Sequence, residues 1–542
     1  MTSGRARWPV LAVLVLVLTA TALRTRAAAR PGLWVDEIFS LAMATGHSLE
    51  HPAADADSTL GDFVQPAGAE PPGVFRRYTE LGETAAGPAR VVRAVLLSDT
   101  NPPLYYLLLN LWMRAAGTSD ASLRLFSVLC SLLALPFLWL IGRALGGERC
   151  AWAASVLFSL SPVASYYSVE GRMYSLLWVL VLALTWLTLR LAEDGKGRRL
   201  HSVLWGVTGA AGLLTHYFFA FVWVASLAWL WLTTPLLRRR VALLAALTAL
   251  AILPWYAQVP ASIARWRVTG DWLVGALEWP GALARPFSLA RSLVASWTDL
   301  GGWRWGEPLL GAAAAALVVG LALGKSWGSL LSRPAGLVWA SLAAACVGPL
   351  VFDLTRQTTT SMIPRYALPG LPAALLLTAL ALSRLPARLH RGVLGMLMVA
   401  WLPGTWKATT AHVPRPRQPY RQLDARIASW AQPGDVVLVR SIPSGVVGVA
   451  RYLRPDIPLV AWVTQLGTRR VPADLERVLR GRRGVAVVTI HDAGARDDVD
   501  PWLRANARLI ERDTFPRSSA ELLYFAPATG DTFFAEVAGR WD

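Results

Sequence analysis

Long apolar segments recur along most of the chain, and short polar connections separate them. Because a helix that crosses the hydrocarbon core of a membrane needs roughly 20 apolar residues, the pattern predicts about eleven transmembrane helices within residues 1–406. The predicted spans lie near residues 8–23, 121–141, 150–166, 173–191, 201–215, 217–237, 241–256, 307–324, 335–352, 366–383 and 391–406. The first of them resembles a cleaved signal peptide, but many spans follow, so we expect it to remain as a helix.

One apolar segment does not fit the alternation of these spans. Residues 103–116 follow two prolines and have a helical pattern, with Tyr105, Tyr106 and Trp112 among them. Prolines are tolerated at the start of a helix, and aromatic residues favour the membrane interface. We therefore predict a helix that lies at the outer interface or re-enters the membrane, rather than a span.

The pattern changes in residues 407–542, where short apolar runs alternate with polar helical stretches. Expected strands are Asp435–Arg440, Pro458–Val463 and Gly484–Ile490, and expected helices are Arg417–Trp430 and Asp498–Ala507. This alternation predicts a small soluble α/β domain. No GxGxxG loop follows a strand, so a nucleotide site is unsupported. His491 and Asp492 end the third strand, where they form either a polar turn or a catalytic pair.

Composition agrees with an integral membrane protein. Of 542 residues, 54% are hydrophobic and only 16% are charged, and the mean hydropathy is +0.41. The net charge of +18 suggests nucleic acid as a partner. We reject that partner, because the arginines lie in short loops on alternate connections, as the positive-inside rule requires; some can hold anionic membrane lipids. The outer side then receives loop 24–120 and the C-terminal domain.

Carboxylates stand out in the first outer loop. Asp36 and Glu37 follow the first span by about a dozen residues, and their apolar flanks predict a membrane-facing amphipathic helix. A carboxylate there can remove a proton from an acceptor hydroxyl. Asp99, before Asn-Pro-Pro, is either a helix cap or a second acidic group of the same cleft. The sequence shows no metal-ligand spacing, although these three carboxylates could bind one divalent cation if they converge.

Other ionisable and aromatic residues lie in short outer turns. Ionisable groups at membrane depth are costly and usually functional, although Glu170 and Arg172 could simply pair with each other. An arginine at the start of a span either binds a phosphate or extends to the interface, and Arg365 and Arg124 have this ambiguity. The candidates for substrate binding are Glu170, Arg172, Tyr174, His216, Arg365 and Tyr366.

Five motifs occur in a fixed order. They are Asp-Glu in the first loop, DTNPPLYYLLL, GTSDASLRLFS, SPVASYYSVEGRMY and PRYALPGLPA. Together they resemble bacterial GT-C glycosyltransferases of the protein O-mannosyltransferase and aminoarabinose-transferase type, the family 39-like proteins. The resemblance covers residues 30–385. Residues 51–90 make the first loop unusually long, and no β-trefoil domain of the MIR type is visible, so eukaryotic-style protein mannosylation is not implied.

The resemblance implies a GT-C fold and a glycosyltransferase of the bacterial cytoplasmic membrane. Its donor would be a polyprenyl-phosphate sugar, and its acceptor a lipid, glycan or protein outside the membrane. The resemblance maps the acidic base onto Asp36, with Glu37 as its partner, and the phosphate-binding arginine onto Arg365, with Arg172 behind it. No cofactor is certain. The alternatives are a flippase for lipid-linked sugars, a non-catalytic scaffold, or another GT-C activity such as an oligosaccharide ligase.

Overall fold

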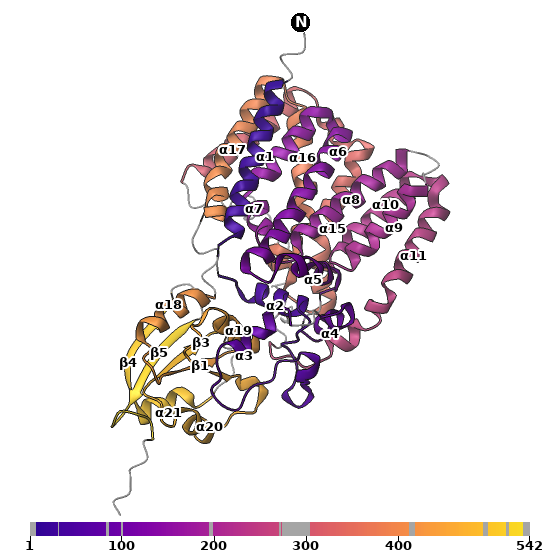
Figure 1. Ribbon diagram of the computed structural model, residues 1–542. Helices are drawn as coiled ribbons and strands as arrows, with labels where there is room; N and C mark the ends of the chain where they lie inside the picture. Colours follow the sequence, from indigo (N-terminus) through magenta and orange to yellow (C-terminus); the bar gives the residue numbers. More distant parts are fainter. Residues whose placement is uncertain are drawn as a thin grey trace, which may run out of the picture.

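The chain is described from a computed structural model, and Figure 1 gives its architecture. A bundle of long helices occupies one end, a β-sheet with its helices occupies the other, and short helices lie between them. The structure describes residues 7–30, 32–82, 86–98, 101–193, 199–269, 273, 304–410, 418–491, 497–515 and 520–534.

Apolar segments form the bundle, as the sequence predicts. Its helices are α1 (Arg7–Ala28), α6 (Asp120–Leu160), α7 (Pro162–Ser168), α8 (Tyr174–Glu193), α9 (Arg199–Leu213), α10 (Phe219–Thr233), α11 (Arg238–Tyr256), α14 (Gly306–Leu323), α15 (Arg333–Arg356), α16 (Leu371–Ser383) and α17 (Ala387–Thr410). The chain bends sharply within α6, where Gly147 has a φ of +73° that a side chain would oppose. Among the described residues, six helical stretches are long and apolar enough to cross a membrane. A multi-pass helical membrane fold is therefore confirmed, and the expected number of eleven spans stays a prediction.

Short helices connect the bundle to the sheet. They are α2 (Val35–Ala44), α3 (Gly73–Arg76), α4 (Pro88–Ser98), α5 (Leu104–Ala116) and α12 (Val259–Ile263). Helix α5 begins directly after Pro102-Pro103, as predicted. The expectation of a membrane-facing α2 is wrong. Its apolar side chains, Ile38 and Leu41 among them, are fully buried in the protein, because α4, α5 and the helix α19 (Pro443–Tyr452) all pack against α2.

The described residues from 418 to 534 form what we call the sheet unit. Its strands are β1 (Val436–Arg440), β2 (Leu459–Trp462), β3 (Val485–Thr489), β4 (Ala507–Thr514) and β5 (Glu521–Pro527), and its helices are α18 (Tyr420–Trp430), α19, α20 (Ala473–Leu479) and α21 (Val499–Asn506). The strand order is β2-β1-β3-β5-β4. The first three strands are parallel, and β5 and β4 add an antiparallel edge. The three parallel strands and the helices α18 and α21 lie where the hydrophobic pattern predicts them.

Alternate residues of the parallel strands face two different cores. Val437 and Val439 pack with α18 and α19, whereas Val436 and Leu438 pack with α20 and α21. Successive strand residues point to opposite faces, so apolar runs of this kind are typical of a sheet covered on both sides. The first core is continuous with the core of the helical bundle. The α19 face therefore joins the sheet unit to the connecting helices (Figure 1).

Candidate active site

Asp36 and Arg365 form an ion pair where the bundle meets the connecting helices. Asp36 lies in the first turn of α2, and Arg365 lies in the 3-10 helix η7 (Pro364–Gly370) that leads into α16. The Arg365 guanidinium donates to the Asp36 carboxylate at 3.0 Å. The two side chains are 15% and 20% exposed. This partial exposure leaves both groups accessible to a substrate.

Glu37 has a different setting from its neighbour. Its side chain is only 1% exposed and forms a two-pronged ion pair with Arg124, with N–O distances of 2.7 and 2.6 Å. It also accepts the backbone N–H of Gly171 at 2.9 Å and that of Trp34 at 3.3 Å. These four hydrogen bonds occupy both carboxylate oxygens. Glu37 thus links α2 to α6 and to the turn after α7.

Arg172 lies in that same turn and faces α2. Its guanidinium is directed at the backbone oxygen of Asp36 (3.4 Å), the hydroxyl of Ser40 (3.3 Å) and the hydroxyl of Tyr106 (3.3 Å). Both Arg172 and Glu170 are buried, at 6% and 4% exposed. The structure therefore brings Arg172 to the first turn of α2, where it adds positive charge beside Asp36.

Three predicted aromatic residues form one cluster near Arg365. The His216 ring lies between Tyr174 and Tyr366, with ring centroids 6.3 and 6.5 Å away. The Nδ1 atom of His216 accepts the backbone N–H of Phe218 at 3.1 Å, which orients the ring. Tyr174 lies within electrostatic range of Arg365, Glu170, Arg172 and Asp36. The cluster supplies an aromatic wall beside the ion pair.

An apolar groove begins next to Arg365. Pro364 and Ala367, which flank Arg365 along the chain, line a cavity of about 460 Å³ between α14, α15 and α16. Its further lining includes Leu317, Trp339, Leu342, Leu371, Ala374 and Thr378. Arg365 is thus close in the chain to residues that line an apolar groove, and a cation near such a groove suits a ligand with an anionic head and a hydrocarbon tail.

Asp99 lies outside the described residues, so its place in the site stays a prediction. Within the described part of the chain, no group of three or more His, Cys, Asp or Glu side chains could hold a metal ion. The other predicted site residues all come from four segments: the first turn of α2, the turn before α8 with the first residue of α8, the turn before α10, and η7.

Two contributors were not expected from the sequence. Asp120 belongs to a motif but was not distinguished from its neighbours, and Tyr452 carries no sequence signal at all. Both hold the backbone just before Asp36: Gly32 donates to Asp120 and Leu33 donates to the Tyr452 hydroxyl, each at 2.8 Å. Only the position of Asp120 at the start of a predicted helix marks it as a polar residue near the site.

Comparison with known proteins gives two results that agree with this geometry. The family described as dolichyl-phosphate-mannose-protein mannosyltransferase matches residues 100–257. The structure is similar to that of ArnT from Cupriavidus metallidurans in the apo state, at 15% identity and a TM-score of 0.57, with 95% of this chain and 97% of that chain covered. ArnT bound to undecaprenyl phosphate gives 14% identity, a TM-score of 0.55, and coverages of 97% and 98%. The search of curated proteins finds no match.

The multi-pass helical fold, the shared architecture over nearly the whole chain and the partial family match together define the class. The class is that of multi-pass membrane proteins with the fold of ArnT.

Proposed function

We propose that this protein transfers a sugar from a polyprenyl-phosphate donor to an acceptor in the bacterial cell envelope, at the outer face of the cytoplasmic membrane. The observation that carries the proposal is the ion pair between Asp36 and Arg365, whose chain neighbours Pro364 and Ala367 line an apolar groove. The pair offers a base for an acceptor hydroxyl and a cation for a phosphate within one partly exposed cleft. The binding of undecaprenyl phosphate by ArnT, a protein of the same fold, supports this choice of donor.

The donor would lie along the groove with its phosphate at Arg365. Lipid tails are apolar and fit the lining of the cavity, and a guanidinium matches two phosphate oxygens. As the bond between the anomeric carbon and the phosphate oxygen breaks, negative charge grows on the departing polyprenyl phosphate. Arg365 would stabilise that charge in the transition state. Because the leaving group already carries its phosphate, no nucleotide-binding fold is needed.

Asp36 would act as the general base. The acceptor hydroxyl passes its proton to the Asp36 carboxylate while its oxygen forms the new bond to the anomeric carbon. Attack opposite to the departing phosphate inverts the configuration at that carbon. When the donor phosphate takes Arg365 as its partner, the carboxylate of Asp36 becomes available to the acceptor. The aromatic cluster of Tyr174, His216 and Tyr366 would cover the sugar between the two groups.

Glu37, Arg124 and Arg172 would serve as positioning residues. A carboxylate with both oxygens engaged by four hydrogen bonds is a poor proton acceptor, so we assign the base role to Asp36 alone. Arg172 reaches the Asp36 backbone and the Ser40 hydroxyl. It would hold the first turn of α2 and add positive charge near the phosphate.

The membrane orientation rests on the basic connections, which the positive-inside rule assigns to the cytoplasm. The connecting helices and the sheet unit then lie outside, where the sheet unit would form an extracytoplasmic domain over the cleft. The two ends of the bundle support this arrangement, because α1 starts at the end far from the sheet (Figure 1).

A transfer assay tests the proposal. Purified protein in lipid vesicles receives radiolabelled polyprenyl-phosphate sugars and envelope fractions, in parallel with the variants Asp36→Asn and Asp57→Asn. Asp57 is an exposed carboxylate of the same connecting segment whose side chain caps a short 3-10 helix, so it is the matched control. General-base catalysis contributes about 10²–10⁴-fold, so Asp36→Asn should lose at least that much transfer, and Asp57→Asn should lose none.

Three outcomes would change the proposal. Equal transfer by wild type and Asp36→Asn would remove Asp36 as the base. Labelled lipid that crosses the bilayer without any transfer would indicate a flippase. Transfer of a preassembled oligosaccharide alone would indicate a ligase. Addition of EDTA and then Mg²⁺ to the same assay tests whether a divalent cation takes part.

A further inference from the structure

The backbone just before Asp36 is held by side chains at every step. Four successive N–H groups each donate to a different side chain. They are Gly32 to Asp120 (2.8 Å), Leu33 to Tyr452 (2.8 Å), Trp34 to Glu37 (3.3 Å) and Val35 to Gln418 (3.4 Å). Asp120 and Glu37 belong to the helical part of the chain, and Tyr452 and Gln418 belong to the sheet unit. The segment that leads into the base is therefore shared between the two parts.

The carbonyl groups of this segment are held as well. Arg124 donates to the backbone oxygen of Arg30 at 2.8 Å and to that of Gly32 at 2.7 Å, while its remaining contacts go to Glu37. Gly32 has a φ of +109°, in the region that favours glycine, so the chain turns there before it enters α2. A turn with both its donors and its acceptors engaged has few ways to move. The direction in which α2 presents Asp36 is thus set from outside the helix.

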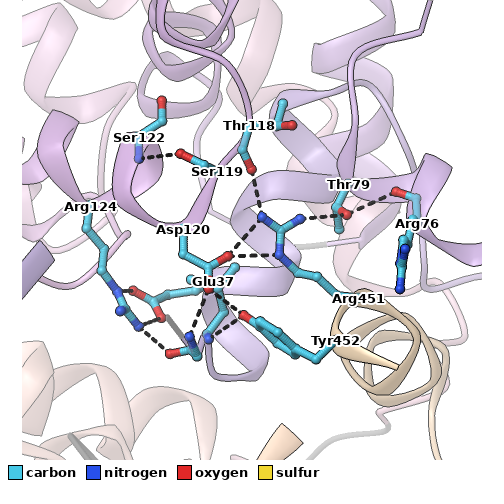
Figure 2. Close-up of polar contacts among 12 residues, drawn as sticks. Glu37, Arg76, Thr79, Thr118, Ser119, Asp120, Ser122, Arg124, Arg451 and Tyr452 are labelled. Carbon is cyan, nitrogen blue, oxygen red and sulfur yellow. Dashed lines mark hydrogen bonds and ion pairs between the residues drawn. The ribbon is translucent and has the colours of Figure 1, made fainter. Parts of the chain in front are cut away.

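Asp120 is the centre of the contact between the two parts (Figure 2). Its Oδ1 accepts from Arg451 at 2.9 Å, and its Oδ2 accepts from the Tyr452 hydroxyl at 2.7 Å as well as from Gly32. Arg451 also reaches Thr118 and Thr79. Asp120 and Arg451 are 11% and 12% exposed. The Tyr452 hydroxyl donates to Asp120 and accepts from Leu33, so it joins the anchor directly to the backbone of the base segment.

Stability alone is a poor explanation for this arrangement. Ion pairs that are largely removed from water often contribute little net stability, because desolvation offsets their attraction. What such a pair does provide is a fixed geometry between its partners. Catalysis by a general base depends on placement within a fraction of an ångström, and a displacement of about 1 Å can cost about 10²-fold in rate.

We infer that Tyr452 and Asp120 are positioning residues for Asp36, and that the sheet unit is part of the catalytic site through them. This inference rests on the proposed function, in which Asp36 is the base. The inference gives α19 a role beyond packing. Its last residue, Tyr452, accepts the backbone N–H of Leu33, three residues before Asp36. Arg451 supports the same contact by holding the other oxygen of Asp120.

A second residue of the sheet unit lies close to the base. His491 follows β3, and its Nε2 atom is buried without a hydrogen-bond partner among the described residues. Burial lowers the pKa of His491 to about 4, while the nearby charge of Asp36 acts to raise it. The imidazole of His491 is therefore neutral at physiological pH. The sheet unit thus contributes both a backbone anchor and a polar side chain to the surroundings of Asp36.

The variant Tyr452→Phe tests the inference, with Tyr524→Phe as its matched control. Each removes one hydroxyl that donates to an aspartate, at 2.7 Å to Asp120 and at 2.8 Å to Asp435, and Tyr524 makes its bond inside the sheet unit. We expect Tyr452→Phe to lower kcat about tenfold with little change in the donor KM. Tyr524→Phe should leave both constants unchanged. Arg451→Gln should lower kcat in the same direction.

Amide hydrogen exchange of the peptide that covers residues 32–38 gives a second readout that needs no turnover. Faster exchange there in Tyr452→Phe, and not in Tyr524→Phe, would support the positioning role even if no donor is transferred, in which case only the proposed function fails. Unchanged exchange would overturn the inference. The inference would also be overturned if the wild type is active and Tyr452→Phe has the same kcat.

Discussion

Asp36 and Arg365 stand 329 positions apart in the chain, and their side chains meet at 3.0 Å. One is supplied by the first turn of α2 and the other by the 3-10 helix before α16. A phosphate that binds Arg365 competes directly with the Asp36 carboxylate for the same guanidinium. If Asp36 is the base and Arg365 binds the donor phosphate, as we propose, donor binding and release of the base are coupled, because Asp36 stays paired with Arg365 until the phosphate arrives.

Arg365→Gln should weaken the use of the donor more than Arg384→Gln, a change directly after the last residue of α16. Loss of a charged donor to a developing oxyanion costs about 10²–10³-fold, so we expect kcat/KM for the polyprenyl-phosphate sugar to fall by about that factor. Arg365→Lys should recover only part of it, because an ammonium lacks the two-pronged geometry. Arg384→Gln is the control, because Arg384 directly follows α16 and its guanidinium donates to the backbone oxygen of Leu145. Donor kinetics identical to wild type would contradict the assignment.

Substitutions of Glu37 and of Asp36 should have different effects: the first should lower the stability of the protein, and the second should lower its activity. Glu37→Gln leaves Arg124 buried beside a neutral group, and breaking a buried ion pair in this way costs about 3–5 kcal/mol. Asp36→Asn removes a partly exposed pair and should cost at most about 1 kcal/mol, although transfer is lost. Chemical unfolding in detergent measures both. Two results would contradict a stabilising role for the ion pair between Glu37 and Arg124. One is a wild-type unfolding midpoint for Glu37→Gln. The other is a double variant, Glu37→Gln/Arg124→Gln, whose loss of unfolding free energy equals the sum of the losses in the two single variants.

The groove should make the KM for the donor depend on the length of its polyprenyl chain. Ala374→Trp places a large ring in the cavity, whereas Leu402→Trp places the same ring on an exposed face of α17. We expect Ala374→Trp to raise the KM for long polyprenyl donors and to leave short-chain donors unaffected, because only a long tail fills the groove. Steady-state kinetics with donors of two lengths provide the measurement. An equal rise in KM for both lengths, or the same effect in Leu402→Trp, would place the tail elsewhere.

Glu50 should make stability depend on pH. Burial raises the pKa of Glu50 to about 7, although hydrogen bonds from Thr269 and the charge of Arg267 oppose the shift. A raised pKa means that the protonated form is favoured in the folded protein. The stability linked to Glu50 is therefore complete below the unfolded pKa of about 4.5 and is lost as pH rises through about 7.

Glu50→Gln keeps the neutral form at every pH, so it should gain about 1–3 kcal/mol relative to wild type between pH 5 and pH 8. Asp62→Asn is the control. Burial acts to raise the pKa of Asp62, but hydrogen bonds from Arg93 lower it below its usual value. The contribution of Asp62 to stability therefore does not change between pH 5 and pH 8. Unfolding midpoints at the two pH values decide the matter. A constant difference for Glu50→Gln would mean that the protonation state of Glu50 does not change between these two pH values.

Local patterns predicted most of the elements of this fold. The apolar segments of the bundle, the helix after Pro103, and the strands from Val436 to Thr489 all follow from periodicity and from proline placement. The packing of α2 did not follow. Its apolar residues suggested a surface that faces lipid, but the same residues serve equally well against protein, and periodicity does not distinguish the two environments.

The sequence by itself determined that this is a multi-pass helical membrane protein with a sheet-forming C-terminal region, and it identified Asp36, Arg172 and Arg365 as candidates. Only the tertiary structure decided how the two adjacent carboxylates differ. Consecutive helix residues point about 100° apart, so Asp36 and Glu37 meet different partners: Arg365 at a partly exposed position and Arg124 in the core. The contacts of Asp120 with Arg451 and Tyr452 likewise join residues more than 300 positions apart. Such contacts leave no local pattern, because they depend on how distant elements pack.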